Sequence, residues 1–200
     1  MTVGRRDAIV VALAAALAAA AAVPAAPASG APAAAAAAPS PRVIAGQAIG
    51  VTAGTLRVGT QVKPSRLGKR VFVDARHGFA LDAAGQATYA VATSDGGRTW
   101  RTSSPALVVH AAQAPLEVSE IGAVSSRVYF ASGAEAADVT PDAGRHWYRA
   151  LFPGAVLSVF QRGPGLGLAA LVEGSGTSVP NDWVYVSADG GRHWRYEERL

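Results

Sequence analysis

The residues best suited to chemistry are an aspartate, a glycine, a threonine or histidine and a tryptophan that recur together three times. The segments read TSDGGRTW at 93–100, TPDAGRHW at 140–147 and SADGGRHW at 187–194, so the aspartates recur every 47 residues. A carboxylate can serve as an acid, a base or a metal ligand. One that repeats at a fixed period beside a glycine is better placed to accept hydrogen bonds from its own turn.

We therefore predict a structural role for these segments, called the boxes below. The hydroxyl and the carboxylate bond across the turn, the glycine takes a positive φ, and the tryptophan returns over its own hairpin and buries its ring. The residues assigned this role are Thr93, Asp95, Gly97 and Trp100, then Thr140, Asp142, Gly144 and Trp147, and then Ser187, Asp189, Gly191 and Trp194.

Other candidate groups lack a pattern that predicts chemistry. His146 and His193 hold equivalent box positions where the first box has Thr99, which favours a role in turn packing, and neither His77 nor His110 has ligand spacing to another histidine or acid. The chain has no cysteine, which excludes disulfides, thiolate metal sites and a cysteine nucleophile. No phosphate-loop, dinucleotide, calcium-loop or serine-triad motif is present. The sequence thus predicts no catalytic, cofactor-binding or metal-binding residue and no cofactor.

Short strand-like runs surround each box and must position it. A strand precedes and another follows each box, which makes the box the loop of a β-hairpin. Two further candidate strands lie upstream of each hairpin, giving four per repeat, the pattern of a β-propeller blade. The runs are 70–74, 78–81, 87–93 and 100–102 around the first box, 117–124 and 127–131 before the second, and 156–160, 166–172 and 183–187 before the third.

The N-terminal part has a different composition. Arg5 and Arg6 precede an apolar run that Pro24 ends, and we expect 1–23 to be a signal peptide, with an uncleaved anchor as the alternative. Residues 24–42 are almost entirely Ala, Pro, Ser and Gly and are expected to form a disordered tether. Residues 43–200 carry the repeats. We therefore expect a secreted or extracytoplasmic protein without a stable membrane span after cleavage.

The charge balance argues against nucleic acid as a partner. The net charge is +4, and without residues 1–42 it falls to +2, from 15 basic and 13 acidic residues. A nucleic-acid binder is expected to carry a basic stripe with aromatic partners. The densest basic stretch, at 63–70, is interpreted as a solvated loop, with a patch for an anionic ligand as the alternative.

The three segments resemble Asp boxes, the BNR repeats of sialidases, sortilin-type receptors, xyloglucan hydrolases and the photosystem II assembly-factor family. The first repeat is most similar to the last family, through VFVDARHGFAL at 71–81 followed by its box, although Asp82 stands where that family has glycine. The second repeat lacks the His-Gly-Phe run and has Ala143 in its box. The resemblance implies that the boxes are structural turns, and it implies a protein-binding scaffold.

The repeat length raises the question of closure, because residues 43–200 hold only about 3.4 repeats and propellers need four to eight blades. We expect an all-β, β-propeller-like array of about three to four four-stranded antiparallel blades, incomplete or open, in which 43–62 supplies part of another blade. A fragment of a longer gene and a ring shared by several chains are the alternatives. An open array leaves a sheet edge through which copies could associate.

The expected function is a non-catalytic binding or assembly scaffold for a protein or glycan outside the cytoplasm. The alternative is a carbohydrate-active enzyme of the sialidase or glycosidase type, or a truncated remnant of one. The resemblance to sialidases would require a tyrosine nucleophile, a glutamate partner, an arginine triad and an aspartate acid. Tyr89, Tyr129, Tyr185 and Glu173 can be nominated, but each is explained more simply as strand or loop composition.

Overall fold

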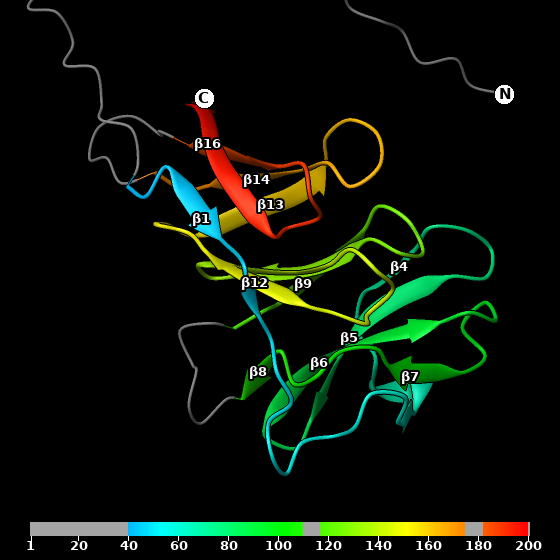
Figure 1. The fold of residues 1–200 in the computed structure, drawn as a ribbon. Coiled ribbons are helices and arrows are strands. Elements are labelled where there is room, and N and C mark those ends of the chain that lie inside the picture. Colours follow the sequence, from blue (N-terminus) through cyan, green and yellow to red (C-terminus); the bar gives the residue numbers. More distant parts are fainter. Residues whose placement is uncertain (1–39, 110–116, 175–181, 200) are drawn as a thin grey trace, which may run out of the picture. The chain divides into compact units, whose positions relative to one another are not determined.

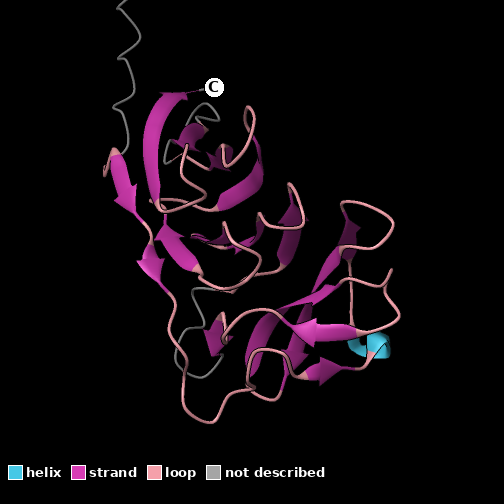
Figure 2. Ribbon diagram, turned by 45° about the vertical axis from the view of Figure 1, so that its right-hand side comes forward, coloured by secondary structure: helices cyan, strands magenta, loops and turns pink. Residues whose placement is uncertain are grey.

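The structure is a computed structural model that describes residues 40–109, 117–174 and 182–199. In these ranges the chain is all-β, and the only helical element is a 3-10 turn, η1 (Pro64–Arg66) (Figures 1 and 2). The predicted signal peptide 1–23 and the tether 24–42 up to residue 39 lie outside the described residues.

The strands form three antiparallel sheets that follow one another along the chain. Sheet 1 contains β4 (Arg70–Phe72), β5 (Gly78–Ala84), β6 (Ala87–Thr93) and β7 (Trp100–Thr102), with β8 (Val108–Val109) also pairing with β6. Sheet 2 contains β9 (Glu120–Ala123), β10 (Tyr129–Gly133), β11 (Ala136–Thr140) and β12 (Tyr148–Leu151). Sheet 3 contains β13 (Val156–Gln161), β14 (Leu168–Val172), β15 (Trp183–Ser187) and β16 (His193–Arg199).

Each sheet is a four-stranded meander whose third and fourth strands are joined by a box. The prediction of an open, all-β, propeller-like array is therefore confirmed, and strands β6, β7 and β15 occupy the predicted ranges. Strands β9 and β10 begin three and two residues later than predicted, at Glu120 and Tyr129.

The prediction for residues 43–62 was wrong. This segment, called the strap below, forms no blade of its own but adds one short strand to the outer edge of each sheet (Figure 1). Strand β1 (Val43–Ala45) pairs with β16, β2 (Gln47–Ala48) with β12, and β3 (Gln61–Val62) with β7. The strap therefore crosses the three sheets in the reverse of their chain order, and it adds one strand to each four-stranded meander.

Close backbone contacts hold the strap between these strands. Gly46 N donates to Arg192 O (2.7 Å), and Ile49 N donates to Trp147 O (2.8 Å). A Cβ added at Gly46 would lie 2.6 Å from Gly191 O, closer than real Cβ atoms approach a backbone oxygen. Gly46 is therefore required by the close passage of two backbones rather than by a positive φ.

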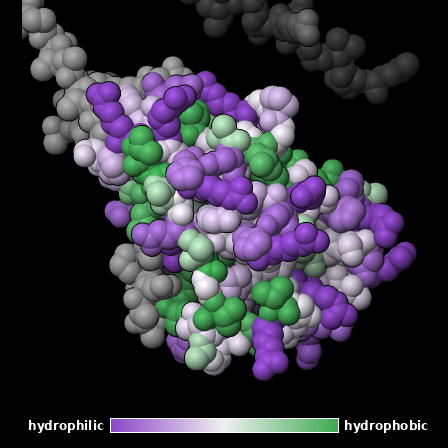
Figure 3. All heavy atoms as spheres, in the orientation of Figure 1, coloured by the Kyte–Doolittle hydropathy of each residue, from purple (hydrophilic) through white to green (hydrophobic). Residues whose placement is uncertain are grey.

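The hydrophobic core lies between the sheets, whereas the face drawn in Figure 3 mixes hydrophilic and hydrophobic residues. Phe79, Leu107, Ile121, Tyr129 and Trp147 belong to the cluster shared by sheets 1 and 2, where the Phe79 and Tyr129 rings stack at 4.0 Å between centroids. A second cluster joins sheets 2 and 3 and includes Phe130, Val139, Phe152, Leu168, Tyr185 and Trp194. The apolar face of one sheet is thus shielded from solvent by the sheet of the next repeat, as expected for stacked repeats.

The other face of sheet 1 has no preceding repeat to cover it. There the box residue Trp100 packs with Val62 of the strap and with Leu67, which follows η1. The strap and the segment after it therefore occupy the place of a missing blade and bury the Trp100 ring completely.

Candidate functional site

The three boxes share one hydrogen-bond pattern. In the first, Thr93 Oγ1 donates to Asp95 Oδ1 (2.7 Å) and accepts from Gly97 N (3.0 Å), while Asp95 Oδ1 also accepts from Thr99 N (2.9 Å). Gly97 has a φ of +88°, in the left-handed region that favours glycine. The same bonds recur in the other boxes, between Thr140, Asp142, Gly144 and His146 and between Ser187, Asp189, Gly191 and His193.

The box histidines take the place of a hydroxyl. Thr99 Oγ1 donates to Asp95 Oδ2 at 2.7 Å, and the Nδ1 atoms of His146 and His193 lie 2.6 and 2.7 Å from the equivalent oxygens of Asp142 and Asp189. Because an ionised carboxylate only accepts, these Nδ1 atoms carry the proton. The histidines therefore close the turn.

These bonds keep the box carboxylates ionised. The backbone and side-chain hydrogen bonds from Thr99 hold the pKa of Asp95 far below its usual range. Burial raises the pKa of Asp142 and Asp189, but bonds from the ring and backbone of His146 and His193 outweigh it, and both pKa values end below the usual one. Ionised carboxylates whose lone pairs are engaged in their own turns are poor general acids.

The box tryptophans do more than the sequence predicted. Trp100 and Trp194 donate their Nε1–H to Gly97 O and Gly191 O of their own boxes, as expected of a hairpin anchor. Trp147 instead donates to Ser103 O of sheet 1 (3.0 Å). Box glycines also touch the preceding sheet, because a Cβ at Gly191 would lie 2.6 Å from Val139 Cβ. The boxes therefore also join neighbouring sheets.

The residues nominated for a tyrosine-based active site do not come together. Tyr89, Tyr129 and Tyr185 are each 0–1% exposed and belong to three different hydrophobic clusters. Burial raises the pKa of Tyr129 and of Tyr185 to about 12, the opposite of what a nucleophilic tyrosine needs. Glu173 is exposed at the end of sheet 3.

The remaining histidines form no metal site within the described residues. His77 Nδ1 lies 2.8 Å from Asp74 Oδ2 in an exposed turn, and His110 lies outside the described ranges. Across residues 40–109, 117–174 and 182–199, no group of three or more histidines and acids is placed to hold a metal ion. No described helix is long and apolar enough to cross a membrane.

Sequence reasoning missed a buried ion pair in sheet 2, between Asp138 and Arg149, that faces sheet 1. Arg149 Nε and Nη2 donate to the two carboxylate oxygens of Asp138 at 2.7 and 2.6 Å, and Nη2 also donates to Leu107 O. Bidentate pairing satisfies both buried charges. The repeat itself could have revealed this ion pair. In each hairpin, the residue four positions before the box aspartate lies opposite the residue seven positions after it. These pairs are Val91 with Thr102, Asp138 with Arg149, and Tyr185 with Tyr196.

Asp82 is a second buried acid, and it has fewer hydrogen-bond partners than Asp138. Asp82 is 0% exposed and neither carboxylate oxygen has a hydrogen bond, although Arg66 Nη2 lies 3.2 Å from Oδ1. Burial raises the pKa of Asp82, and the nearby Arg66 charge offsets only part of this rise. Asp82 stands where the photosystem II assembly-factor family has glycine. Its contact with Arg66 of η1 places it beneath the segment that covers sheet 1.

The main candidate site lies along the edge formed by the first strand of each sheet. Within the described residues, strands β4, β9 and β13 end the strand order of their sheets and each pairs on one side only, whereas the strap covers the opposite edges. Unpaired strand edges are templates for pairing with another chain. The prediction of an open edge thus applies to the first strands.

A cavity of about 400 Å³ opens between sheets 2 and 3 at this edge, and it is called the first-strand groove below. Ile121, Phe130 and Val159 give it a buried apolar floor, and Leu157 stands on its rim with 51% of its surface exposed. The remaining lining residues are Lys69, Glu120, Gly122, Ser132 and Ser158.

Two polar features mark the first-strand groove. Ser132 is 96% buried (4% exposed) and lines the groove with a hydroxyl that can donate and accept a hydrogen bond. Lys69 Nζ and Glu120 Oε2 form an exposed ion pair of 2.6 Å at the mouth.

Comparison with known proteins adds no family. A scan against protein-family models finds no match, and a search of curated proteins finds no similar sequence. The geometry of the described residues is therefore the basis for the function proposed below.

Proposed function

We propose that this chain is an exported, non-catalytic scaffold that binds an extended apolar segment of a partner protein in the first-strand groove. The observation that carries the proposal is the groove itself, in which an apolar floor, the Ser132 hydroxyl and the edges of β9 and β13 that no described strand covers lie together. Export follows from the basic, apolar and small-residue pattern of 1–23.

An extended peptide matches each of these features. Its backbone can pair with a free strand edge, while alternate side chains point toward the sheet and can enter a pocket. The apolar floor favours an aliphatic or aromatic side chain, and Ser132 Oγ can bond to the neighbouring peptide group. The cavity of about 400 Å³ is within the range of small-ligand pockets and can hold one or two side chains.

A protein segment fits the groove better than a glycan does. Sugar sites stack the ring on an exposed aromatic face, and a glycosidase also needs two acids about 5–10 Å apart. The groove is lined by one aromatic residue, Phe130, and by one acid, Glu120, which is paired with Lys69. The engaged box aspartates and the separation of Tyr89, Tyr129 and Tyr185 likewise support a non-catalytic role.

The resemblance to Asp-box proteins agrees with this proposal. The box pattern and the His-Gly-Phe run at 77–79 are similar to the photosystem II assembly-factor family, whose members are protein-binding scaffolds. The shared 47-residue period and the common hydrogen bonds of the boxes support the same grouping.

The test is to select peptides from a random displayed library on the full chain and measure their affinity for variants. Leu157→Glu places a charge on the rim and is expected to weaken binding at least tenfold, because a peptide would then lose an apolar contact with the half-exposed side chain and would bury an unpaired charge. Leu166→Glu, on an exposed leucine in the turn before β14 and outside the groove, is the matched control and is expected to bind as wild type.

Peptides that bind Leu157→Glu and wild type equally would place the interaction elsewhere and contradict the proposal. Binding of glycans, but no peptides, to the wild-type chain would favour the carbohydrate alternative.

A further inference from the structure

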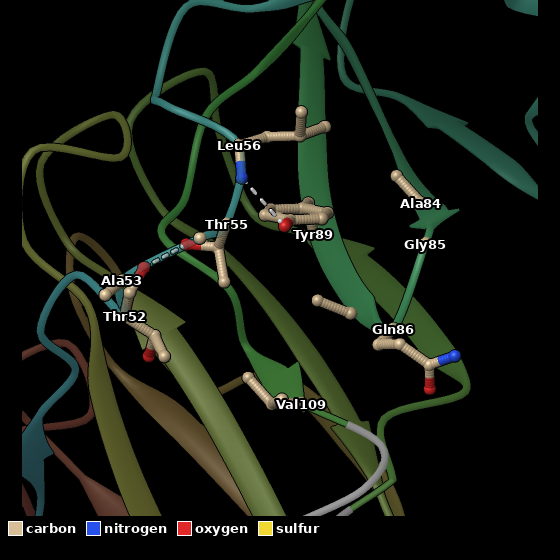
Figure 4. Close-up of a pocket in the computed structure, with 11 residues that line it drawn as sticks. Thr52, Ala53, Thr55, Leu56, Ala84, Gly85, Gln86, Tyr89 and Val109 are labelled. Atoms are coloured by element: carbon tan, nitrogen blue, oxygen red, sulfur yellow. Dashed lines mark hydrogen bonds between the residues drawn. The ribbon is translucent and has the colours of Figure 1, made fainter.

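A second hollow lies on sheet 1, between the strap and the turn that joins β5 to β6 (Figure 4). It has a volume of about 350 Å³ and shares no lining residue with the first-strand groove. Its walls are residues 52–56 of the strap, residues 84–87 around the β5–β6 turn, Tyr89 and Val109.

The walls are well defined. On the strap side, Thr55 Oγ1 donates to Thr52 O (2.6 Å), and Gly54 adopts a φ of +78°. On the opposite side, Gly85 adopts a φ of +62° in a tight β-hairpin. Hydrogen bonding and turn geometry therefore hold both sides of the hollow in place without a ligand.

Tyr89 supplies the hollow with a hydrogen-bond donor. The residue is 1% exposed, and its hydroxyl accepts from Leu56 N at 2.9 Å, across the gap between β6 and the strap (Figure 4). A tyrosine hydroxyl can accept and donate at once, so the Tyr89 hydroxyl can still donate its own proton to an acceptor in the hollow.

The chemistry of the lining defines what can enter. Among the described residues, no charged side chain lines the hollow, and most of its surface comes from Ala, Leu and Val side chains, the Tyr89 ring and backbone. Without a cation nearby, an anion would lose its hydration and gain no ion pair. A neutral apolar body carrying one hydrogen-bond acceptor would bury the body and take the Tyr89 proton.

We propose that this hollow, here called the Tyr89 site, binds a small, neutral, largely apolar molecule that carries a carbonyl acceptor. The site is independent of peptide binding in the first-strand groove and goes beyond the function proposed above. The apolar body contacts the strap and the β5–β6 turn, and the carbonyl oxygen accepts from the Tyr89 hydroxyl.

The experiment titrates cyclohexanone into the ¹⁵N-labelled full chain and follows the backbone amides by NMR. Saturable shifts are expected at Leu56, whose N–H already bonds to Tyr89, and at Gly85. Tyr89→Phe removes the donor and is expected to weaken binding about threefold to tenfold, the usual range for a neutral hydrogen bond. Tyr185→Phe is the matched control, because it removes a buried hydroxyl from the equivalent strand of sheet 3, and it should bind as wild type.

Two further measurements protect the test from a folding defect. Ala53→Trp fills the hollow from an exposed strap position and is expected to abolish the shifts while the rest of the spectrum is unchanged. Cyclohexanecarboxylate, with the same ring and a negative charge, is expected to bind at least tenfold more weakly. The proposal is overturned by absent shifts at Leu56 and Gly85, by equal affinity of Tyr89→Phe and wild type, or by tighter binding of the carboxylate.

Discussion

Replacing Asp189 by alanine tests how much one box contributes to stability. The carboxylate accepts from Ser187 Oγ at 2.9 Å, from Arg192 N at 3.1 Å, from His193 N at 2.9 Å and from His193 Nδ1 at 2.7 Å. Alanine removes all of these acceptors at once, while Gly191 stays in its left-handed conformation with less to hold it.

The expected loss is worked out from the exposure of the donors. A hydrogen bond to a charged group contributes about 1.5–3 kcal/mol when buried, but the Asp189 side chain is 37% exposed, so water replaces part of each bond. A net loss of about 2 kcal/mol is therefore expected. It should shrink below about pH 4, because an Asp189 whose pKa is lowered in the folded state stabilises only above the unfolded pKa and loses this effect as the pH falls through the folded one.

The assay is urea unfolding followed by tryptophan fluorescence, with free energies compared at equal m values. Glu173→Ala is the matched control, because it removes the same charge from an exposed position of sheet 3 outside any box. The structural role of the boxes is refuted if Asp189→Ala loses no more stability than Glu173→Ala.

Two other substitutions test the buried acid and the strap. Asp82→Asn is expected to raise the free energy of unfolding at pH 7, because burial raises the pKa of this carboxyl and its ionised form is therefore destabilising. The gain in stability should vanish near pH 4, where the wild-type carboxyl is protonated. A loss of stability at pH 7, measured by urea unfolding, would contradict this expectation. Gly46→Val is expected to lower the free energy of unfolding by about 1–3 kcal/mol and to speed hydrogen exchange in β16 and β12, because its Cβ would meet Gly191 O. Gly50→Val has open space around its Cβ and should change neither quantity. Equal hydrogen exchange in both variants would show that the strap is not held tightly at Gly46.

The repeat was the part of the fold that the sequence predicted best. Strands such as β6 (Ala87–Thr93) and β15 (Trp183–Ser187) are long, β-branched or aromatic, and bounded by boxes, so local pattern was enough to locate them. Strand β14 was predicted two residues too long at its start, since Leu166 lies in a turn that local composition does not distinguish from the strand.

The strap could not be predicted in the same way. Its strands have two or three residues, too few for an alternating pattern, and they exist because the outer edges of β7, β12 and β16 offer partners far away in the sequence. The first-strand groove depends on the same long-range assembly, since Phe130 and Leu157 come from different sheets. The Asp138–Arg149 pair was accessible in principle, because the common hairpin register places the two residues opposite each other.

Hydrogen exchange with and without a selected peptide tests binding at the first-strand groove most directly. If an extended segment pairs with the free edges, the peptide will slow exchange of backbone amides in β9 (Glu120–Ala123) and β13 (Val156–Gln161), and Leu157→Glu will remove this protection. Protection confined to the strap, or none in β9 and β13 under saturating peptide, would contradict the proposed function.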